Sequence, residues 1–113
     1  MHELFAPAAT WHLRGDLPIS GIWQGRDAIL GEFLTRALGH YEPGSVTLQP
    51  TGTVAEGGTV VLEWITRVRT RAGAPYENFC IAVFTVRAGR IQAVREYMDT
   101  LYASRVAFAP VSP

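Results

Sequence analysis

Residues 59–71 read TVVLEWITRVRTR, and the alternation within this stretch decides the fold class. Val60, Leu62 and Trp64 fall on one face of an extended chain, and the opposite face carries charged side chains such as Arg67. A period of two is typical of a β-strand with one buried face and one solvated face. The stretch therefore predicts a strand in a sheet that is covered on one side only.

The sequence on both sides of this strand extends the pattern. Residues 45–54 alternate weakly before a glycine-rich hairpin turn, residues 76–87 are apolar on both faces, and residues 90–102 follow a tight Ala-Gly turn. Upstream, residues 26–38 repeat apolar side chains at helical spacing, and a glycine then ends the helix. One helix followed by strands joined through short turns predicts an α+β fold, with a curved antiparallel sheet wrapped around the helix.

The composition narrows the class of protein. The chain has 113 residues, so we expect a single domain over residues 1–113, in which residues 104–113 form a loose tail. Ten arginines balance ten acidic residues and there is no lysine, which argues against a nucleic-acid binder, a lysine Schiff base and a Walker-type phosphate loop. Cys80 lies in an apolar run typical of a buried thiol in a reducing compartment. With no signal-peptide pattern and no apolar run of about 20 residues, we expect a cytoplasmic protein without a membrane span.

Seven short motifs carry a family resemblance. They are LFA (4–6), ATWH (9–12), PISG (18–21), GRDAI (25–29), YEN (76–78), FTVRAGRI (84–91) and VREYMDT (94–100). Their order and spacing resemble the SnoaL-like proteins of the NTF2-like superfamily, and the last three are similar to the closing hairpin of ketosteroid isomerase-related proteins. The resemblance implies a cone-shaped α+β barrel, often dimeric, with a pocket between the helix and the concave sheet. The family domain normally opens with one or two further helices, so residues 1–9 are expected to hold only the last turn of a shortened or missing N-terminal helix.

Glu96 is the first candidate catalytic residue. Val94, Glu96 and Met98 share one face of the last predicted strand. If that face is concave, a lone carboxylate lies in an apolar pocket, and its pKa rises toward the range of a general base. If that face is the outer one, Glu96 forms an ion pair with Arg95 or Arg67. The pattern leaves both alternatives open.

Three enzyme types with this fold provide templates. In ketosteroid isomerases the carboxylate base would fall at Leu13 and the buried acid near Ala82, and the tyrosine donor would lie on the missing helix. Compared with limonene epoxide hydrolases, Glu96 resembles the acid on the last strand. Trp11 and Leu13 stand where those enzymes have two polar residues that hold water. Residues 67–69 resemble the Arg–Asp pair of an earlier strand but lack its acid. SnoaL-type polyketide cyclases need only one carboxylate and a pocket of suitable shape, which Glu96 can supply.

Two further polar residues are weaker catalytic candidates. His12 becomes a base only if a bulge turns it toward the pocket, because alternation places it opposite Trp11. Asp99 stands where the last strand ends and is better suited to accepting backbone hydrogen bonds. The residues expected to line or shape the pocket are Trp11, Leu13, Phe33, Trp64, Asn78, Ala82, Phe84 and Met98. No His, Cys or carboxylate spacing indicates a metal site, and no cofactor is expected.

The sequence thus predicts a small-molecule pocket, with cofactor-free proton transfer of the isomerase or cyclase type on an apolar cyclic substrate. The alternatives are a non-catalytic ligand-binding or dimerisation module, an epoxide-hydrolase-like enzyme and a protein–protein adaptor. We expect a homodimer formed through the outer sheet face. The arginine row at residues 67, 69 and 71 is interpreted as a solvated surface rather than a nucleic-acid site, since no aromatic platform accompanies it.

Overall fold

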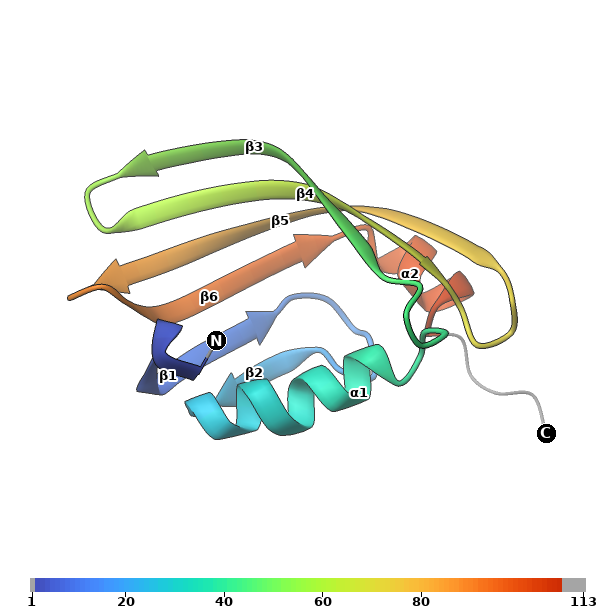
Figure 1. The fold of residues 1–113 in the computed structure, drawn as a ribbon, viewed down its shortest axis with the longest axis horizontal. Helices are drawn as coiled ribbons and strands as arrows, with labels where there is room; N and C mark the ends of the chain where they lie inside the picture. The colour runs from blue at the N-terminus through green and yellow to red at the C-terminus, as the bar shows by residue number, and fades with distance from the viewer. Residues whose placement is uncertain (1, 109–113) are drawn as a thin grey trace.

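The computed structural model describes residues 2–108, and its centre is one curved six-stranded sheet (Figure 1). The strands are β1 (Phe5–Leu13), β2 (Gly21–Gln24), β3 (Thr47–Glu56), β4 (Thr59–Arg69), β5 (Pro75–Arg87) and β6 (Arg90–Met98). Their order across the sheet is β2-β1-β6-β5-β4-β3. The strands predicted over residues 59–71 and 76–87 are confirmed as β4 and β5, and the whole of β4 pairs with residues 75–85 of β5.

The sheet is mixed rather than purely antiparallel. β1 pairs antiparallel with β2, and β3 to β6 pair antiparallel in chain order, but β1 and β6 run parallel, with Trp11 opposite Val94 and Leu13 opposite Glu96. Parallel neighbours need a long connection, and here the helix and two hairpins lie between them in the chain. Because this pairing joins the first and last strands, no local sequence pattern indicates whether the two strands run parallel or antiparallel.

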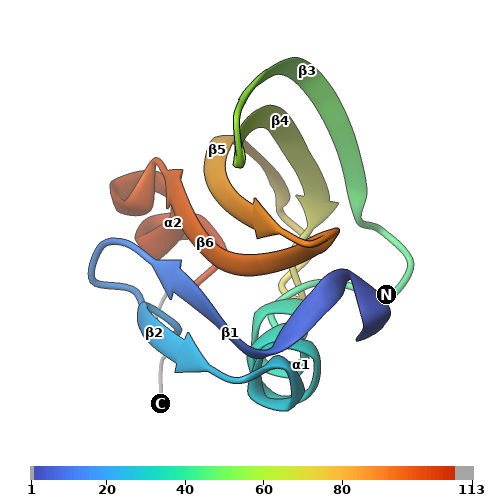
Figure 2. The same cartoon turned by 90° about the vertical axis from the view of Figure 1, so that its left-hand side faces the viewer.

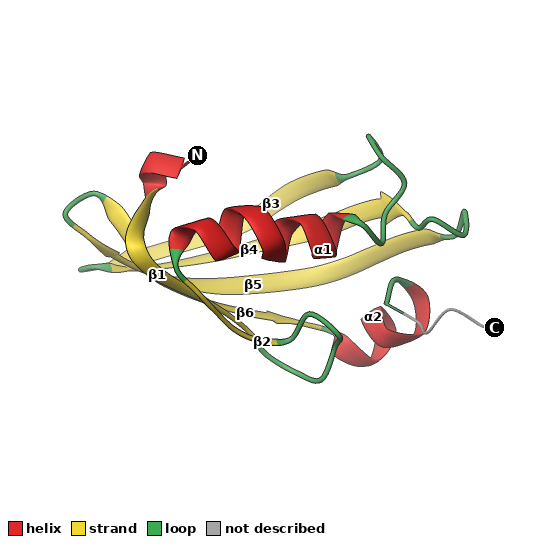
Figure 3. Cartoon of the chain, turned by 90° about the horizontal axis from the view of Figure 1, so that it is seen from below, coloured by secondary structure: helices red, strands yellow, loops and turns green. Residues whose placement is uncertain are grey.

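The helix lies across the concave face of the sheet (Figures 2 and 3). It begins with a π-helical segment, Ala28–Phe33, and continues as α1, Leu34–Leu38. Ile29 and Phe33 are buried against the sheet, as the apolar stripe predicted. This arrangement confirms an α+β fold and leaves a hollow between the helix and the curved strands.

Both ends of the described chain differ from the sequence-based prediction. The helical turn expected within residues 1–9 is confined to a short 3-10 turn at residues 2–4, and residues 5–9 instead belong to β1. The last strand ends at Met98, after which α2 (Thr100–Val106) begins with Asp99 as its N-cap. The loose tail predicted from residue 104 is wrong over residues 104–108, because α2 includes residues 104–106 and Phe108 is buried in the core. Residues 109–113 lie outside the described residues.

The two faces of the sheet differ in character. The concave face contributes to two apolar clusters, one centred on Leu13, Phe33 and Tyr76, the other on Ile29 and Val94. The outer face is partly exposed and mixes apolar side chains with ion pairs. Within residues 2–108, no helix is long and apolar enough to cross a membrane.

Candidate functional site

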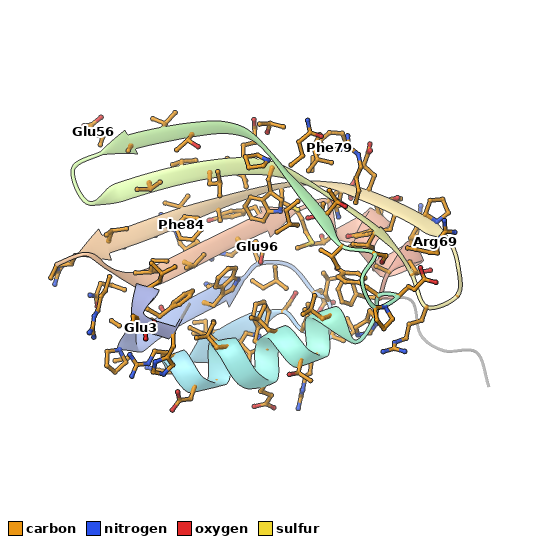
Figure 4. All side chains as sticks on the ribbon, viewed as in Figure 1. Glu3, Glu56, Arg69, Phe79, Phe84 and Glu96 are labelled. Carbon is orange, nitrogen blue, oxygen red and sulfur yellow. The ribbon has the colours of Figure 1, made fainter. Side chains whose placement is uncertain are left out.

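A cavity of about 200 Å³ lies between the sheet and α1. Its walls are largely apolar, and their aromatic members are Trp11, Phe33, Tyr41, Trp64, Tyr76 and Phe108. Among the lining residues, Glu96 alone carries a charge (Figure 4). A protein cavity of about 150 Å³ is enough to hold benzene. The volume therefore suits one ring with substituents.

Glu96 is 8% exposed, and one hydrogen bond holds its carboxyl group. The indole Nε1 of Trp11 donates to Oε1 over 3.0 Å, and no residue within 2–108 donates to Oε2. Burial raises the pKa of Glu96 from 4.5 to about 7, and the Trp11 hydrogen bond opposes this rise. Near neutral pH the carboxyl group is therefore populated in both protonation states, which is the condition for accepting a proton and returning it.

The strand register explains why Glu96 faces inward. Glu96 lies between Leu13 on β1 and Ala82 on β5, and the small Ala82 side chain is fully buried beside it. The ion-pair alternative is excluded, because Arg67 instead binds Glu77 on the outer face with an Nε–Oε2 distance of 2.7 Å. Glu96 thus has no cationic partner in the described structure.

A short chain of polar side chains forms another part of the wall. Trp64 Nε1 donates to Thr66 Oγ1 over 3.0 Å, and this hydroxyl lies 3.5 Å from Cys80 Sγ. Burial raises the pKa of the Cys80 thiol to about 11. The thiol is therefore neutral near pH 7 and is a poor nucleophile.

Family membership follows from a comparison with known families. A family model described as a SnoaL-like domain matches residues 1–94. The chain belongs to this family. The resemblance carried by the seven sequence motifs is thereby confirmed. A search of curated proteins found no match.

Solved structures share the fold of this SnoaL-like domain. Bal32a, from a soil-derived mobile gene cassette, is 29% identical, with 95% of this chain and 80% of that chain covered and a TM-score of 0.81. An NTF2-like protein from Burkholderia thailandensis is 27% identical, with coverages of 97% and 83% and a TM-score of 0.81. A putative SnoaL-like polyketide cyclase from Jannaschia sp. CCS1 is 14% identical, with coverages of 96% and 76% and a TM-score of 0.79. At that identity, the last likeness shows the fold alone.

Most of the residues predicted to line the pocket of the SnoaL-like domain do so. Trp11, Leu13, Phe33, Trp64 and Met98 line the cavity together with Glu96. Trp11 has a second role that the sequence did not indicate, because its indole binds the candidate base directly.

Three predicted pocket residues lie beside the cavity rather than in its wall. Asn78 is buried behind it, hydrogen-bonded to Asp99 and Tyr76. Ala82 lies beside Glu96 on the neighbouring strand. Phe84 lines a separate shallow apolar groove nearer the β3–β4 turn. All three do face the concave side, so alternation placed them on the correct face but could not place the cavity along the strand.

In the structure, the other two catalytic candidates lie outside the site. His12 faces away from the cavity and pairs across the sheet with Ile22 and Arg95. The bulge in β1 falls between Phe5 and Thr10, before His12, so it does not redirect this side chain. Asp99 caps α2, its Oδ1 accepting from Tyr102 N over 3.0 Å. Within residues 2–108, no cluster of three His, Cys, Asp or Glu side chains could hold a metal ion.

Sequence reasoning missed the two tyrosines of the cavity wall. Tyr76 shares the inward face of β5 with Asn78 and Ala82, so the alternation that selected those residues could also have selected it. Tyr41 follows α1 in a loop, where no periodicity applies. It enters the cavity because its backbone bridges to Thr70 beyond β4.

Proposed function

We propose that this SnoaL-like domain binds a small, apolar, ring-containing molecule and moves a proton within it without a cofactor. The observation that carries this proposal is a single carboxyl group, without a cationic partner, inside an aromatic cavity large enough for one ring. The putative polyketide cyclase among the solved structures supports the same general class of chemistry, through its fold only.

The proposed step needs only the groups of the cavity. The Glu96 carboxylate takes a proton from a carbon next to a carbonyl group, and the electron pair of that C–H bond moves into the new C=C bond while the carbonyl oxygen becomes an enolate. The protonated Glu96 then returns the proton to another carbon of the same conjugated system. Because Trp11 binds Oε1, Oε2 is the oxygen left to act as the base.

Hydrogen–deuterium exchange into a small ring ketone tests this proposal. We expect the wild-type protein to catalyse exchange into cyclohex-2-enone in D2O, with a rate that rises as the pH passes through the Glu96 pKa of about 7. Glu96→Gln should lower the rate by roughly 100-fold or more, as is typical for loss of a general base. Proton NMR measures the rate.

A matched control is Glu77→Gln, which removes an outer-face carboxyl group and should leave the exchange rate unchanged. A ketone that binds the wild type without exchanging would instead identify a non-catalytic ligand-binding module. The epoxide-hydrolase alternative has less support, because the cavity lining within residues 2–108 holds no arginine and no second carboxyl group.

We further propose that two copies associate through an outer patch made of Ile65, Phe79, Ile81 and Tyr97. Ile65 lies opposite Phe79, and Ile81 lies opposite Tyr97, so the four residues form one apolar area across β4, β5 and β6. Phe79 is 66% exposed on the face of the sheet away from α1 (Figure 4). A large exposed apolar patch is typical of a protein interface.

Replacing Phe79 tests this interface. We expect Phe79→Asp to convert the dimer to a monomer, because a charge at the centre of an apolar interface is costly to desolvate. Light scattering over a dilution series measures the mass. Leu101→Asp, at an exposed position on α2, should leave the dimer intact. A wild-type protein that is monomeric at every concentration contradicts the proposal.

A further inference from the structure

The side-chain amide of Asn78 is fixed in one orientation. Asp99 N donates to Asn78 Oδ1 over 3.2 Å, which identifies the oxygen end of the amide. The nitrogen end then donates to Asp99 O over 3.1 Å and to the hydroxyl oxygen of Tyr76 over 2.7 Å. Asn78 is 1% exposed, and its bond to Tyr76 is buried, whereas its two bonds to the Asp99 backbone are partly buried.

This orientation of the amide determines which hydrogen bonds the Tyr76 hydroxyl group can accept and donate. Since both amide hydrogens of Asn78 are used, the Tyr76 oxygen accepts one of them, and the phenol proton must point to a different partner. Residues 2–108 offer it no acceptor. Tyr76 is 3% exposed and lines the cavity. A buried donor without an acceptor is unfavourable, and a ligand oxygen in the cavity would satisfy it.

Two other tyrosine rings stack on the ring that carries this proton. Tyr76 stacks on Tyr41 with a centroid distance of 6.1 Å and on Tyr102 at 5.1 Å. The Tyr102 hydroxyl is itself fixed, because it accepts a hydrogen bond from Glu77 N. The donor is therefore positioned before any ligand arrives, which reduces the entropy lost on binding.

We propose that Tyr76 donates its phenol proton in a hydrogen bond to an oxygen of the substrate, which makes that substrate a neutral one-ring carbonyl compound rather than a hydrocarbon. This inference rests on the proposed function. Glu96 on β6 and Tyr76 on β5 both line the cavity, so one ring can meet the base at a C–H bond and the donor at its oxygen. When Glu96 removes the proton, the oxygen gains negative charge and its hydrogen bond to Tyr76 becomes stronger.

Tyr76 acts as a hydrogen-bond donor and keeps its proton throughout. Burial raises the pKa of its phenol to about 12, against the opposing effect of the Asn78 hydrogen bond. Asn78 is a positioning residue, since it contacts Tyr76 and lies outside the cavity wall. The polarised hydroxyl is a better donor because it accepts from Asn78.

Two matched probes test the donor. Both probes are added to the Glu96→Gln protein, in which no carboxylate repels an anion. The anion 4-nitrophenolate mimics the enolate, and nitrobenzene is the matched neutral probe that lacks the phenolate oxygen. We expect Tyr76→Phe to weaken 4-nitrophenolate binding roughly tenfold or more, as for other hydrogen bonds to charged groups, and to change nitrobenzene binding by less than about twofold. Calorimetry measures both affinities. Tyr102→Phe, outside the cavity wall, should retain the preference for 4-nitrophenolate.

The other outcomes overturn the inference in distinguishable ways. An equal loss of both probes in Tyr76→Phe identifies a packing role only. A selective loss of 4-nitrophenolate in Tyr41→Phe, with Tyr76→Phe unaffected, assigns the donor to Tyr41. A Glu96→Gln protein that binds neither probe overturns the proposed function itself. If Tyr76→Phe does not fold, the chemical shift of the Tyr76 ¹³Cζ resonance tests the inference instead. The inference requires this resonance to shift when 4-nitrophenolate binds and to stay unshifted with nitrobenzene.

Discussion

Glu96→Gln is expected to be more stable than the wild type near pH 8, by about 3 kcal/mol, and equally stable near pH 4. The reason is the pKa of Glu96, which burial raises from 4.5 to about 7. Between these values the folded state binds more protons than the unfolded state, so the stability of the wild type falls as the pH rises. Below pH 4.5 the contribution of the neutral carboxyl group is fully present, and above pH 7 it is lost. Glutamine stays neutral and can still accept the hydrogen bond from Trp11.

Urea unfolding of both proteins at the two pH values measures this difference. Glu77→Gln is the control, because its exposed carboxyl group pairs with Arg67 and its loss should give no gain near pH 8. A Glu96→Gln protein that is less stable at both pH values would mean that the carboxylate is stabilised by a partner. Together with the loss of exchange activity, a gain in stability would mark Glu96 as a residue kept for function.

Asn78→Leu is expected to destabilise the fold by about 3 kcal/mol or more. The replacement leaves the buried Tyr76 hydroxyl group without its hydrogen-bond donor. It also removes the side-chain partner of the Asp99 N–H and carbonyl groups, whose bonds to Asn78 are partly buried. Because Asp99 caps α2, we also expect α2 to detach from β5 before the sheet unfolds. Urea unfolding measures the first effect, and amide hydrogen exchange of residues 100–106 measures the second.

Thr85→Val on the same strand is the matched control. It removes a half-buried polar group for which the described structure contains no side-chain hydrogen bond, so its effect should stay within about 0.5 kcal/mol. If Asn78→Leu costs no more than Thr85→Val, the amide does not hold α2 in place.

The strands and their faces could be predicted because alternation is a local signal. Trp64 on β4 and Met98 on β6 were assigned to the cavity from period-two spacing together with the pocket that the family resemblance implies, and both line it. The ends of elements were predicted less well. Residues 99–102 look like a continuing strand, and the helix α2 appears there only because Asp99 caps it and Phe108 packs into the core.

The parts of the site that were missed depend on contacts between distant residues. Trp11 and Glu96 are 85 residues apart in the chain, and their hydrogen bond exists because β1 pairs parallel with β6. Tyr41 reaches the cavity from a loop. The donor role inferred for Tyr76 requires the orientation of Asn78, which the backbone of Asp99 sets from beyond the end of β6.

The α+β class, the family and the set of side chains that share a face with Glu96 could all be predicted before the fold was known. That this face is the concave one, where the hollow lies along it, and which neighbours reach the carboxyl group became visible only in the folded chain. Alternation relates residues along one strand and is the same whichever face is buried. Burial, and with it the raised pKa of Glu96, arises only when β1, β5 and α1 close around that side chain.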